Sequence, residues 1–512
     1  MRREKGDGTN RVSSPGHLSI GKTALFTAAA TLVLSGCAVG PDFQKPAPPG
    51  VSDYTQQPLT TTESAGAQGG DAQRFDIGKD ISGDWWTVFH SRPLNDLVDE
   101  ALKNNPDLKA AQAALKSSRE SVLAQGGAFF PSVSAGLSAT REQDPSGALA
   151  PVPSNNAFLY NLYTPQVSVS FSPDVWGLNR RTVESLTAQE KGVRFQLFAT
   201  YVTLTSNVVV TAIQIASVDD QIAATRELID ADRKMLDILN EQIDEGYASG
   251  IDLAAQESQL AGAQAALPPL MKQSAQLHDL LATLTGHFPS ESPQADFTFA
   301  SLTLPTDLPV SVPATLVEQR PDIRQAEENL HSASAQIGVA VANRLPNIQI
   351  TAAAGSEALR WGQLFTPGTE FWNLGASLAA PIFQGGQLLH QERAARANYE
   401  QAAQQYKSTV LGAFQNVADT LAALQQDAEA LRAAGVADKA TKNTLDITER
   451  QVRDGYSGNL QLFTAEQAHQ QAHIALVQAE ADRYADTAAL FQALGGGWWH
   501  RTDLAARNDN DN

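Results

Sequence analysis

The chain contains two copies of one pattern, and this duplication constrains its fold more than any other feature. The first copy reads GYASGIDLAAQESQLAGAQAAL from Gly246, and the second reads GYSGNLQLFTAEQAHQQAHIAL from Gly455, at an offset of 209. The same offset places Gly286 on Gly495. A long match at constant offset predicts two repeats of one structural unit.

The match continues upstream through most of the chain. Residues 106–115 fall on 321–330 at an offset of 215, and Pro173 falls on Pro381 at an offset of 208. One change of length, confined to a loop, accounts for the seven-residue change in offset from 215 to 208. We therefore expect a first repeat over 84–290, a linker over 291–313 that lies at mid-height, a second repeat over 314–495 and a C-terminal tail over 496–512.

The N-terminus has the pattern of an export signal. Several basic residues precede an apolar run, Ala24–Leu34, which is too short to span a membrane as a helix. The run ends in LSGC at Cys37, the chain's single cysteine, and LSGC resembles the bacterial lipobox. The resemblance implies a signal peptide over 1–36 and lipid on Cys37. A lone cysteine also excludes a disulfide within the chain and a cysteine metal site.

Composition narrows the remaining classes. The formal charge of -19 argues against a nucleic-acid partner. Residues 37–83 are rich in Pro, Gly, Ser, Thr and Gln, which predicts an extended, irregular strap that adds nothing to a core.

Two segments in each repeat alternate apolar and small polar residues. They predict β-hairpins over 131–173 and 346–381, each with a proline at its base. An apolar face opposite a small polar face suits a membrane barrel with a wet lumen. A soluble sandwich face remains an alternative, because this signal is weak in each strand.

The rest of each repeat is helical. Two proline-free stretches, about 180–245 and 387–454, predict helices of roughly 100 Å at 1.5 Å per residue. Shorter helices are expected at about 94–128, 251–286, 314–343 and 459–494. Pairs of short helices match one long helix in length, and their Ala-rich faces favour an extended coiled-coil wall.

Four membrane strands cannot close a barrel by themselves. The smallest spanning barrels have about eight strands, and unpaired strand edges are not tolerated in lipid. The chain is therefore expected to oligomerise into a joint barrel that a joint helical tube continues.

The chain resembles the TolC-like outer-membrane factors, in their lipoprotein (OprM/NodT) branch. The segments that carry the resemblance are LSGC at 34–37, VGPDF at 39–43, WW at 85–86, YASG at 247–250, RPDI at 320–323, PIFQGG at 381–386 and LGGGW at 494–498. The resemblance implies a mainly α fold with a membrane β part. Three chains would form a joint 12-stranded barrel and an α-helical tunnel.

The same resemblance implies a function. The chain would be the outer-membrane channel of a tripartite, RND-type efflux pump, a passive conduit and not an enzyme. Its partners would be a periplasmic adaptor, an inner-membrane transporter and outer-membrane lipid. No cofactor is expected beyond an N-acyl and diacylglycerol lipid on Cys37. Two alternatives stay open: an outlet for type I protein secretion, and a lipid-anchored periplasmic scaffold without a pore.

The resemblance also points to a gate at the periplasmic tip. The family pattern Leu-Asp-Val-Leu-Asp-Ala is replaced here by LQLFTA at 460–465, so Gln461 and Thr464 stand where aspartates are usual. Asp252 and Glu466 remain as charge near the tip. We expect a tip held closed by Gln and Thr hydrogen bonds, with weaker cation selectivity. The alternative is that these are simply polar residues near a turn. The remaining gate and turn residues are Tyr456, Gly246, Tyr247, Gly250, Gly455 and Gly458.

Other motifs carry little chemistry. His469 and His473 stand four apart on a predicted helix but lack the Glu of a zinc-binding HExxH motif. Exposed helix histidines are the expectation, and no metal is predicted.

Overall fold

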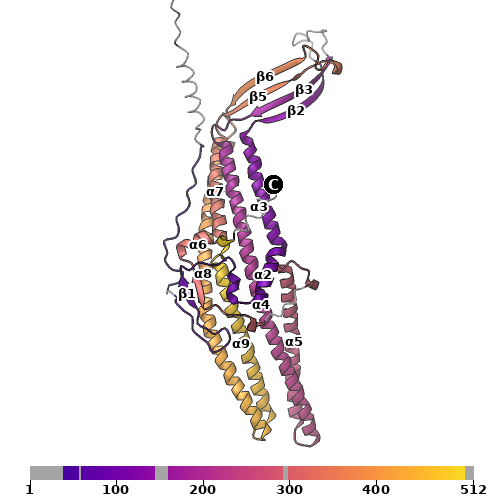
Figure 1. Cartoon of the computed structure of the whole chain (residues 1–512), viewed down its shortest axis with the longest axis vertical. Coiled ribbons are helices and arrows are strands. Elements are labelled where there is room, and N and C mark those ends of the chain that lie inside the picture. The colour runs from indigo at the N-terminus through magenta and orange to yellow at the C-terminus, as the bar shows by residue number, and fades with distance from the viewer. Residues whose placement is uncertain (1–37, 57–58, 144–158, 292–297, 502–512) are drawn as a thin grey trace, which may run out of the picture. The chain divides into compact units, whose positions relative to one another are not determined.

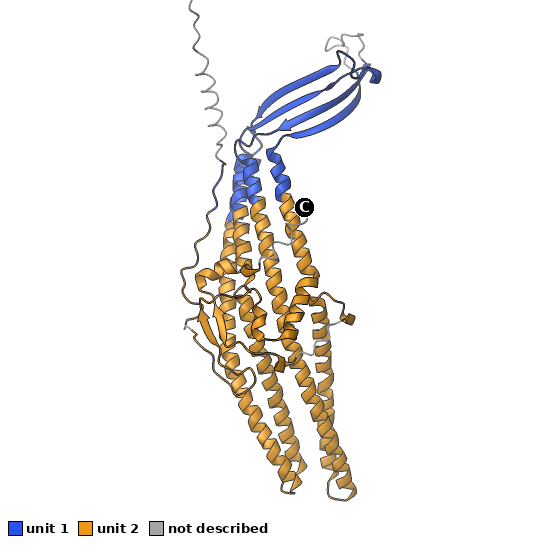
Figure 2. Cartoon of the chain, viewed as in Figure 1, with its two compact units in different colours: residues 1–43, 122–185, 333–399 blue, residues 44–121, 186–332, 400–512 orange. Residues whose placement is uncertain are grey.

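The computed structural model describes residues 38–56, 59–143, 159–291 and 298–501. The predicted signal peptide, Cys37 and most of the C-terminal tail lie outside this part of the chain. The structure divides into two compact units (Figure 2). The first, here called the strand unit, contains 122–185 and 333–399 with the N-terminal residues up to 43, and the second, the helical unit, contains 44–121, 186–332 and 400–512. Each unit draws on both repeats, so the sequence repeats are not the compact units.

The strand unit carries one four-stranded antiparallel sheet in the order β2-β3-β5-β6 (Figure 1). Its strands are β2 (Ser132–Gln143), β3 (Leu159–Phe171), β5 (Asn347–Ser356) and β6 (Glu370–Ala379). The register confirms the predicted alternation. One row across the sheet is apolar: Val133, Val169, Ala352 and Leu374. The next row is mostly small and polar: Ser134, Ser168, Ala353 and Asn373.

The helices follow the predicted pairing of long and short segments. The long ones are α4 (Leu178–Asp244) and α8 (Gln387–Arg453), each of 67 residues. Their return helices are α5 (Gly250–Leu284) and α9 (Asn459–Ala493). The other helices are α2 (Arg92–Asn104), α3 (Pro106–Gly126), α6 (Pro313–Gln319) and α7 (Pro321–Ala342).

Two predicted helices are interrupted. The expected helices 94–128 and 314–343 each break before a proline, at Pro106 and Pro321. Proline disfavours helical backbone in the residue before it and removes an N–H donor. Asn105 makes the restart favourable, since its side-chain oxygen accepts from the backbone N–H groups of Asp107 and Leu108 at 2.9 and 3.1 Å.

The strap departs from expectation, because it contributes to the core together with part of the linker. Strand β1 (Arg74–Ile77) pairs in parallel with β4 (Asp307–Val310). Phe75 and Leu308 are buried in the core of the helical unit. Polar composition averaged over these segments hid the few apolar side chains that dock.

The core of the helical unit forms around an aromatic cluster. Trp85 and Trp86, on the short helix η1 (Trp85–Phe89), are buried. Trp85 stacks on Phe491 at 5.2 Å, and Trp86 meets Tyr201 edge-on at 6.4 Å. An apolar stretch within α4 is long enough to cross a membrane, but 78% of it is buried inside the protein. Its apolar character is that of a core helix.

Candidate functional site: the sheet face, the strand base and the helical tips

The apolar face of the sheet is exposed in the single chain. Val133, Leu137, Trp372 and Leu374 are each more than half exposed. A contiguous apolar surface of this kind is rare on soluble monomers and suits contact with lipid. Neither β2 nor β6 pairs with a further strand in the described part of the chain. The sheet therefore has two open edges that lipid would leave unsatisfied.

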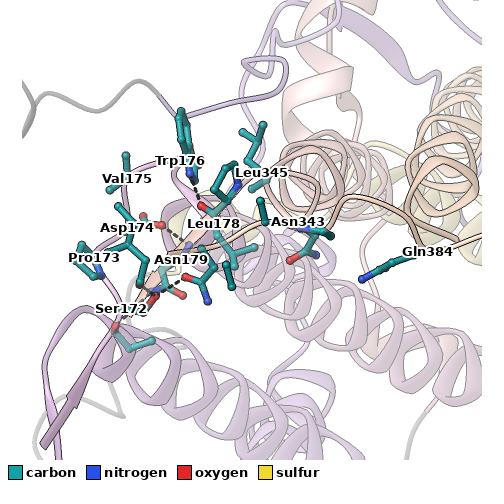
Figure 3. Close-up of a pocket in the computed structure, with 18 residues that line it drawn as sticks. Ser172, Pro173, Asp174, Val175, Trp176, Leu178, Asn179, Asn343, Leu345 and Gln384 are labelled. Atoms are coloured by element: carbon teal, nitrogen blue, oxygen red, sulfur yellow. Dashed lines mark hydrogen bonds between the residues drawn. The ribbon is translucent and has the colours of Figure 1, made fainter. Parts of the chain in front are cut away.

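A cavity of about 720 Å³ lies in the strand unit where the strands meet the helices (Figure 3). Asp174 shapes its wall by accepting from the backbone N–H groups of Asn179 and Arg180 at 2.9 and 3.0 Å, which caps the start of α4. Trp176 donates from Nε1 to the carbonyl of Pro346 at 2.7 Å. The amide side chains that line the cavity are Asn179, Asn343, Asn347 and Gln384. Apolar side chains such as Val175, Leu178 and Leu345 line much of the rest of the cavity, and no sequence motif indicated it.

The two turns between long and return helices have matching geometry. Gly246 and Gly455 adopt φ of 80° and 79°. The N–H of Tyr247 donates to Gln242 O at 2.7 Å, and that of Tyr456 to Gln451 O at 2.8 Å. Left-handed glycines of this kind end helices because they have no side chain to clash. The positions singled out in the sequence therefore do form equivalent helix ends.

The tips expose apolar and aromatic side chains. Tyr247 and Ile251 at the first turn are 81% and 82% exposed, and Tyr456 and Leu460 at the second are 85% and 63% exposed. Large apolar side chains exposed together on a turn are suited to protein contact.

The two return helices begin differently. At α5, Ser249 and Asp252 form a reciprocal capping box, and Gly250 is the first residue of the helix. Hydrogen bonds from Ser249 hold the pKa of Asp252 below its usual value. Asp252 thus has a local capping role. At α9 the N-cap is Gly458, which offers no side-chain cap.

The predicted gate residues fall into two groups. Gln461 and Thr464 are exposed, and the Thr464 hydroxyl donates to Leu460 O of its own helix at 2.9 Å. Their role in closing a pore between chains stays a prediction. Glu466 is different, because it is partly buried and its Oε2 has no hydrogen-bond partner in the described chain. Burial, with Asp232 and Glu449 nearby, raises its pKa to about 7.

Sequence reasoning missed the polar pair that neighbours Glu466. Gln256 of α5 donates from Nε2 to the carbonyl and to Oδ1 of Asp232 at 2.9 and 3.1 Å. Both side chains are fully buried, and burial raises the pKa of Asp232. Polar residues on the buried stripe of a helix were the signal that could have revealed them.

One of the two histidines is less exposed than expected. His469 and His473 lie on α9, with Nδ1 atoms 3.7 and 3.3 Å from Oδ1 of Asp438 on α8. The His469 side chain is only 20% exposed, so the expectation of an exposed histidine was wrong for His469. Among the described residues, no group of three His, Cys, Asp or Glu side chains has an arrangement that would hold a metal ion.

An open sheet with an apolar face, joined in one chain to 67-residue helices, defines a class of outer-membrane channel. The family model described as outer membrane efflux protein matches residues 97–287 and 312–496. These segments are more than half of the chain, so the chain belongs to the outer membrane efflux protein family. The family expected from the sequence is thereby confirmed.

Relatives and solved structures agree with this assignment. The antibiotic efflux pump outer membrane protein ArpC of Pseudomonas putida is 27% identical over 495 residues, covering 94% of this chain and 97% of that protein. The pyoverdine export outer membrane protein OpmQ of Pseudomonas putida is 28% identical over 429 residues, covering 81% and 88%. The structure of the outer-membrane channel OprN superposes with a TM-score of 0.78 at 25% identity, covering 90% of this chain and 100% of that chain. The fold is that of the TolC-like channels.

Proposed function

We propose that the chain is the outer-membrane conduit of a tripartite, RND-type efflux system, which passes small molecules such as drugs or toxic compounds from the periplasm to the outside. The observation that carries this proposal is the four-stranded sheet with an apolar face and open edges. The relatives are named for antibiotic efflux and pyoverdine export, both of small molecules, which supports the same class of cargo. The conduit is passive, and energy enters from the transporter.

The oligomer is a homotrimer in this proposal. Each chain supplies four strands, and three copies would supply twelve, above the roughly eight needed to close a spanning barrel. Edge β2 of one copy would pair with edge β6 of the next, which leaves no strand edge in lipid. The long helices would continue the barrel as a periplasmic tunnel.

The partners are a periplasmic adaptor and an inner-membrane transporter. The exposed tip residues Tyr247, Ile251, Tyr456 and Leu460 support docking of the adaptor at this end. Lipid on Cys37 would tether each chain to the outer membrane. That cysteine lies outside the described residues, so the anchor rests on the LSGC pattern.

Single-channel conductance of the purified, lipidated protein in planar bilayers tests the proposal, with oligomer mass measured in the same detergent. Discrete pore steps from a trimer are the expected result. A monomer or dimer without conductance would overturn the conduit in favour of a scaffold.

A matched pair of variants on β6 sharpens the test. Leu374→Arg places charge on the apolar face, at a cost of roughly 2–4 kcal/mol near the bilayer midplane, and is expected to abolish membrane assembly. Asn373→Arg lies on the opposite face one residue away and is expected to assemble and to shift ion selectivity. Equal assembly of both variants, measured as heat-modifiable oligomer, would contradict a lipid-facing role for this surface.

A further inference from the structure

The first described residues of the strap dock onto a buried arginine in the strand unit. The Arg181 side chain is only 5% exposed. Its Nε donates to Val39 O at 3.0 Å, and its Nη2 donates to Gly40 O at 3.4 Å and to Asp42 Oδ1 at 2.7 Å. Its Nη1 donates to Glu184 Oε2 at 2.7 Å on the same helix. The guanidinium therefore donates hydrogen bonds to two backbone carbonyls and one carboxylate of the strap.

The carboxylate that the strap supplies helps to keep the buried Arg181 side chain charged. Burial lowers the pKa of Arg181, but hydrogen bonds and attraction from Asp42 and Glu184 outweigh it and raise the pKa above its usual value. A buried arginine that loses a partner is left with unsatisfied donors, which is costly. Removing the strap would leave buried donors of Arg181 without acceptors, which is unfavourable in free energy.

Close backbone packing adds a steric contribution. The N–H of Val39 donates to Trp176 O at 3.1 Å. Gly40 has φ of 95°, and a Cβ there would lie 2.4 Å from Gly338 Cα. A Cβ at Gly177 would lie 2.6 Å from Ala38 Cα. Only glycine permits approaches this close, so the residues that follow Cys37 occupy a fitted site and not a loose path.

The helical unit holds its own part of the strap in a similar way. Arg483 of α9 is fully buried. Its Nη2 donates to Asp71 O at 2.7 Å and to Thr62 Oγ1 at 3.2 Å. Gly69 packs against the ring of Tyr484, where a Cβ would lie 2.8 Å from Cε2. Each unit thus holds a strap segment through a buried arginine.

We propose that residues 38–42 and Arg181 form a latch that makes the N-terminal lipid a fixed anchor at the base of the strands. The inference rests on the proposed lipid anchor at Cys37. One peptide unit, about 3.8 Å between Cα atoms, joins Cys37 to the docked Ala38. With the latch closed, insertion of the acyl chains sets the depth of the strand base. With the latch open, the lipid would be a flexible tether. Arg181 is a positioning residue in this scheme.

Hydrogen exchange in the purified, full-length oligomer tests the latch directly. Arg181→Met is expected to raise the exchange rate of the Val39 amide, measured in a peptide covering 38–43, by at least about tenfold. The matched control is Arg194→Met on the same helix, where Arg194 pairs with Glu190 at 3.0 Å. The control is expected to leave the 38–43 peptide unchanged. Unchanged protection in Arg181→Met would overturn the latch.

A second variant covers failure of Arg181→Met to fold. Asp42→Asn leaves every helix intact, since the Asp42 side chain is 92% exposed. It is expected to speed exchange of 38–43 by about two- to fivefold, because one charged acceptor is lost. The latch would be overturned if the 38–43 peptide of Asp42→Asn exchanged as slowly as in the wild type and Arg181→Met gave no faster exchange. The same conclusion would hold if Arg181→Met could not be recovered and Asp42→Asn kept wild-type protection.

A separate measurement distinguishes this inference from the anchor itself. The mass of the N-terminal peptide reports lipid on Cys37. Without lipid in the wild type, the fixed-anchor inference fails together with the proposed lipid anchor, and the exchange result then reports only a docked strap. With lipid present, Arg181→Met is expected to retain it and to lower the yield of membrane-assembled oligomer severalfold. Full assembly of a lipidated variant whose 38–43 peptide exchanges freely would overturn the fixed anchor.

Discussion

The two helical tips arise from one duplicated sequence, yet they are stabilised differently. Both end their long helix on a left-handed glycine, Gly246 or Gly455. The first tip has a capping box at Ser249 and the buried pair Asp232 and Gln256. At the offset of 209, the second tip has Gly458, Thr441 and Ala465 in these places. The two turns have the same backbone geometry, whereas the polar interactions that stabilise the two hairpins differ.

This difference indicates unequal roles. The first hairpin has a side-chain cap on its return helix and a buried hydrogen bond between its two helices, from Gln256 to Asp232. The second lacks a side-chain cap and instead places Glu466 beside the first hairpin's Asp232. We expect the second hairpin to be the part that responds to conditions and opens.

The largest effect is expected from Gln256→Ala. The change removes the donor to a fully buried Asp232 and leaves a small cavity. Local opening of the first hairpin should become easier by about 2–3 kcal/mol. Hydrogen exchange of residues 232–260 measures it. Thr441→Ala, at the equivalent of Asp232 in the second repeat, is the control and should change exchange little. If Gln256→Ala and Thr441→Ala changed exchange equally, the two hairpins would not differ in how buried polar groups stabilise them.

The next effect is a pH dependence of the second hairpin. The packed state raises the pKa of Glu466 to about 7 from 4.5. A raised pKa stabilises packing fully below pH 4.5, and that contribution is lost as pH rises through about 7. Open probability in bilayers should therefore rise about tenfold from pH 5 to pH 8, after discounting for partial exposure.

Glu466→Gln should abolish this pH response. Glu257 occupies the equivalent position in the first repeat and is exposed, so Glu257→Gln should leave the response intact. A response that persists in Glu466→Gln would place the titrating group elsewhere.

The charge of the second tip gives a third comparison. Asp252 is acidic at the first tip, whereas Gln461 and Thr464 are neutral at the second. Gln461→Asp with Thr464→Asp should raise the preference for cations over anions by roughly five- to tenfold, as acidic rings in pores do. Reversal potentials in a salt gradient measure the preference. An unchanged ratio would remove these two positions from the narrow part of the pore.

The smallest effects concern the caps. Ser249→Ala removes the capping box of α5 and should destabilise its first turn by about 1 kcal/mol. Gly458→Ser adds a cap to α9 and should stabilise it by only a few tenths of a kcal/mol, roughly the difference between glycine and serine caps. A Cβ at Gly458 would meet only the end of the Gln461 side chain, at 3.3 Å. Hydrogen exchange of the first-turn amides of α5 and α9 measures both effects. If Gly458→Ser stabilised α9 by as much as Ser249→Ala destabilises α5, the assigned cap geometry would be contradicted.

Much of the architecture was predictable because it depends on periodicity. Alternating residues such as Val133 and Ser134 predicted the strands and their two faces, and the register of the sheet confirmed them. Proline-free stretches predicted α4 and α8 to within two residues at each end. The helix breaks at Pro106 and Pro321 were missed, because a helical pattern continues across each proline and only the local backbone conformation changes.

The candidate site was predictable only where a turn imposes residue identity. Gly246 and Gly455 could be placed because left-handed backbone needs glycine there. The role of Asp252 as a cap, and the burial of Glu466, could not be placed, because both depend on which groups face them from other helices.

The sequence by itself determined the duplication, the strands, the long helices and the helix ends, since these follow from local backbone preference and from hydrophobic period. Tertiary structure alone decided which polar groups meet. Asp42 and Asp71 lie in a strap of low-complexity composition, and only the fold brings that strap to Arg181 and Arg483. Such pairings depend on burial and on distances between segments far apart in the chain, and composition carries neither.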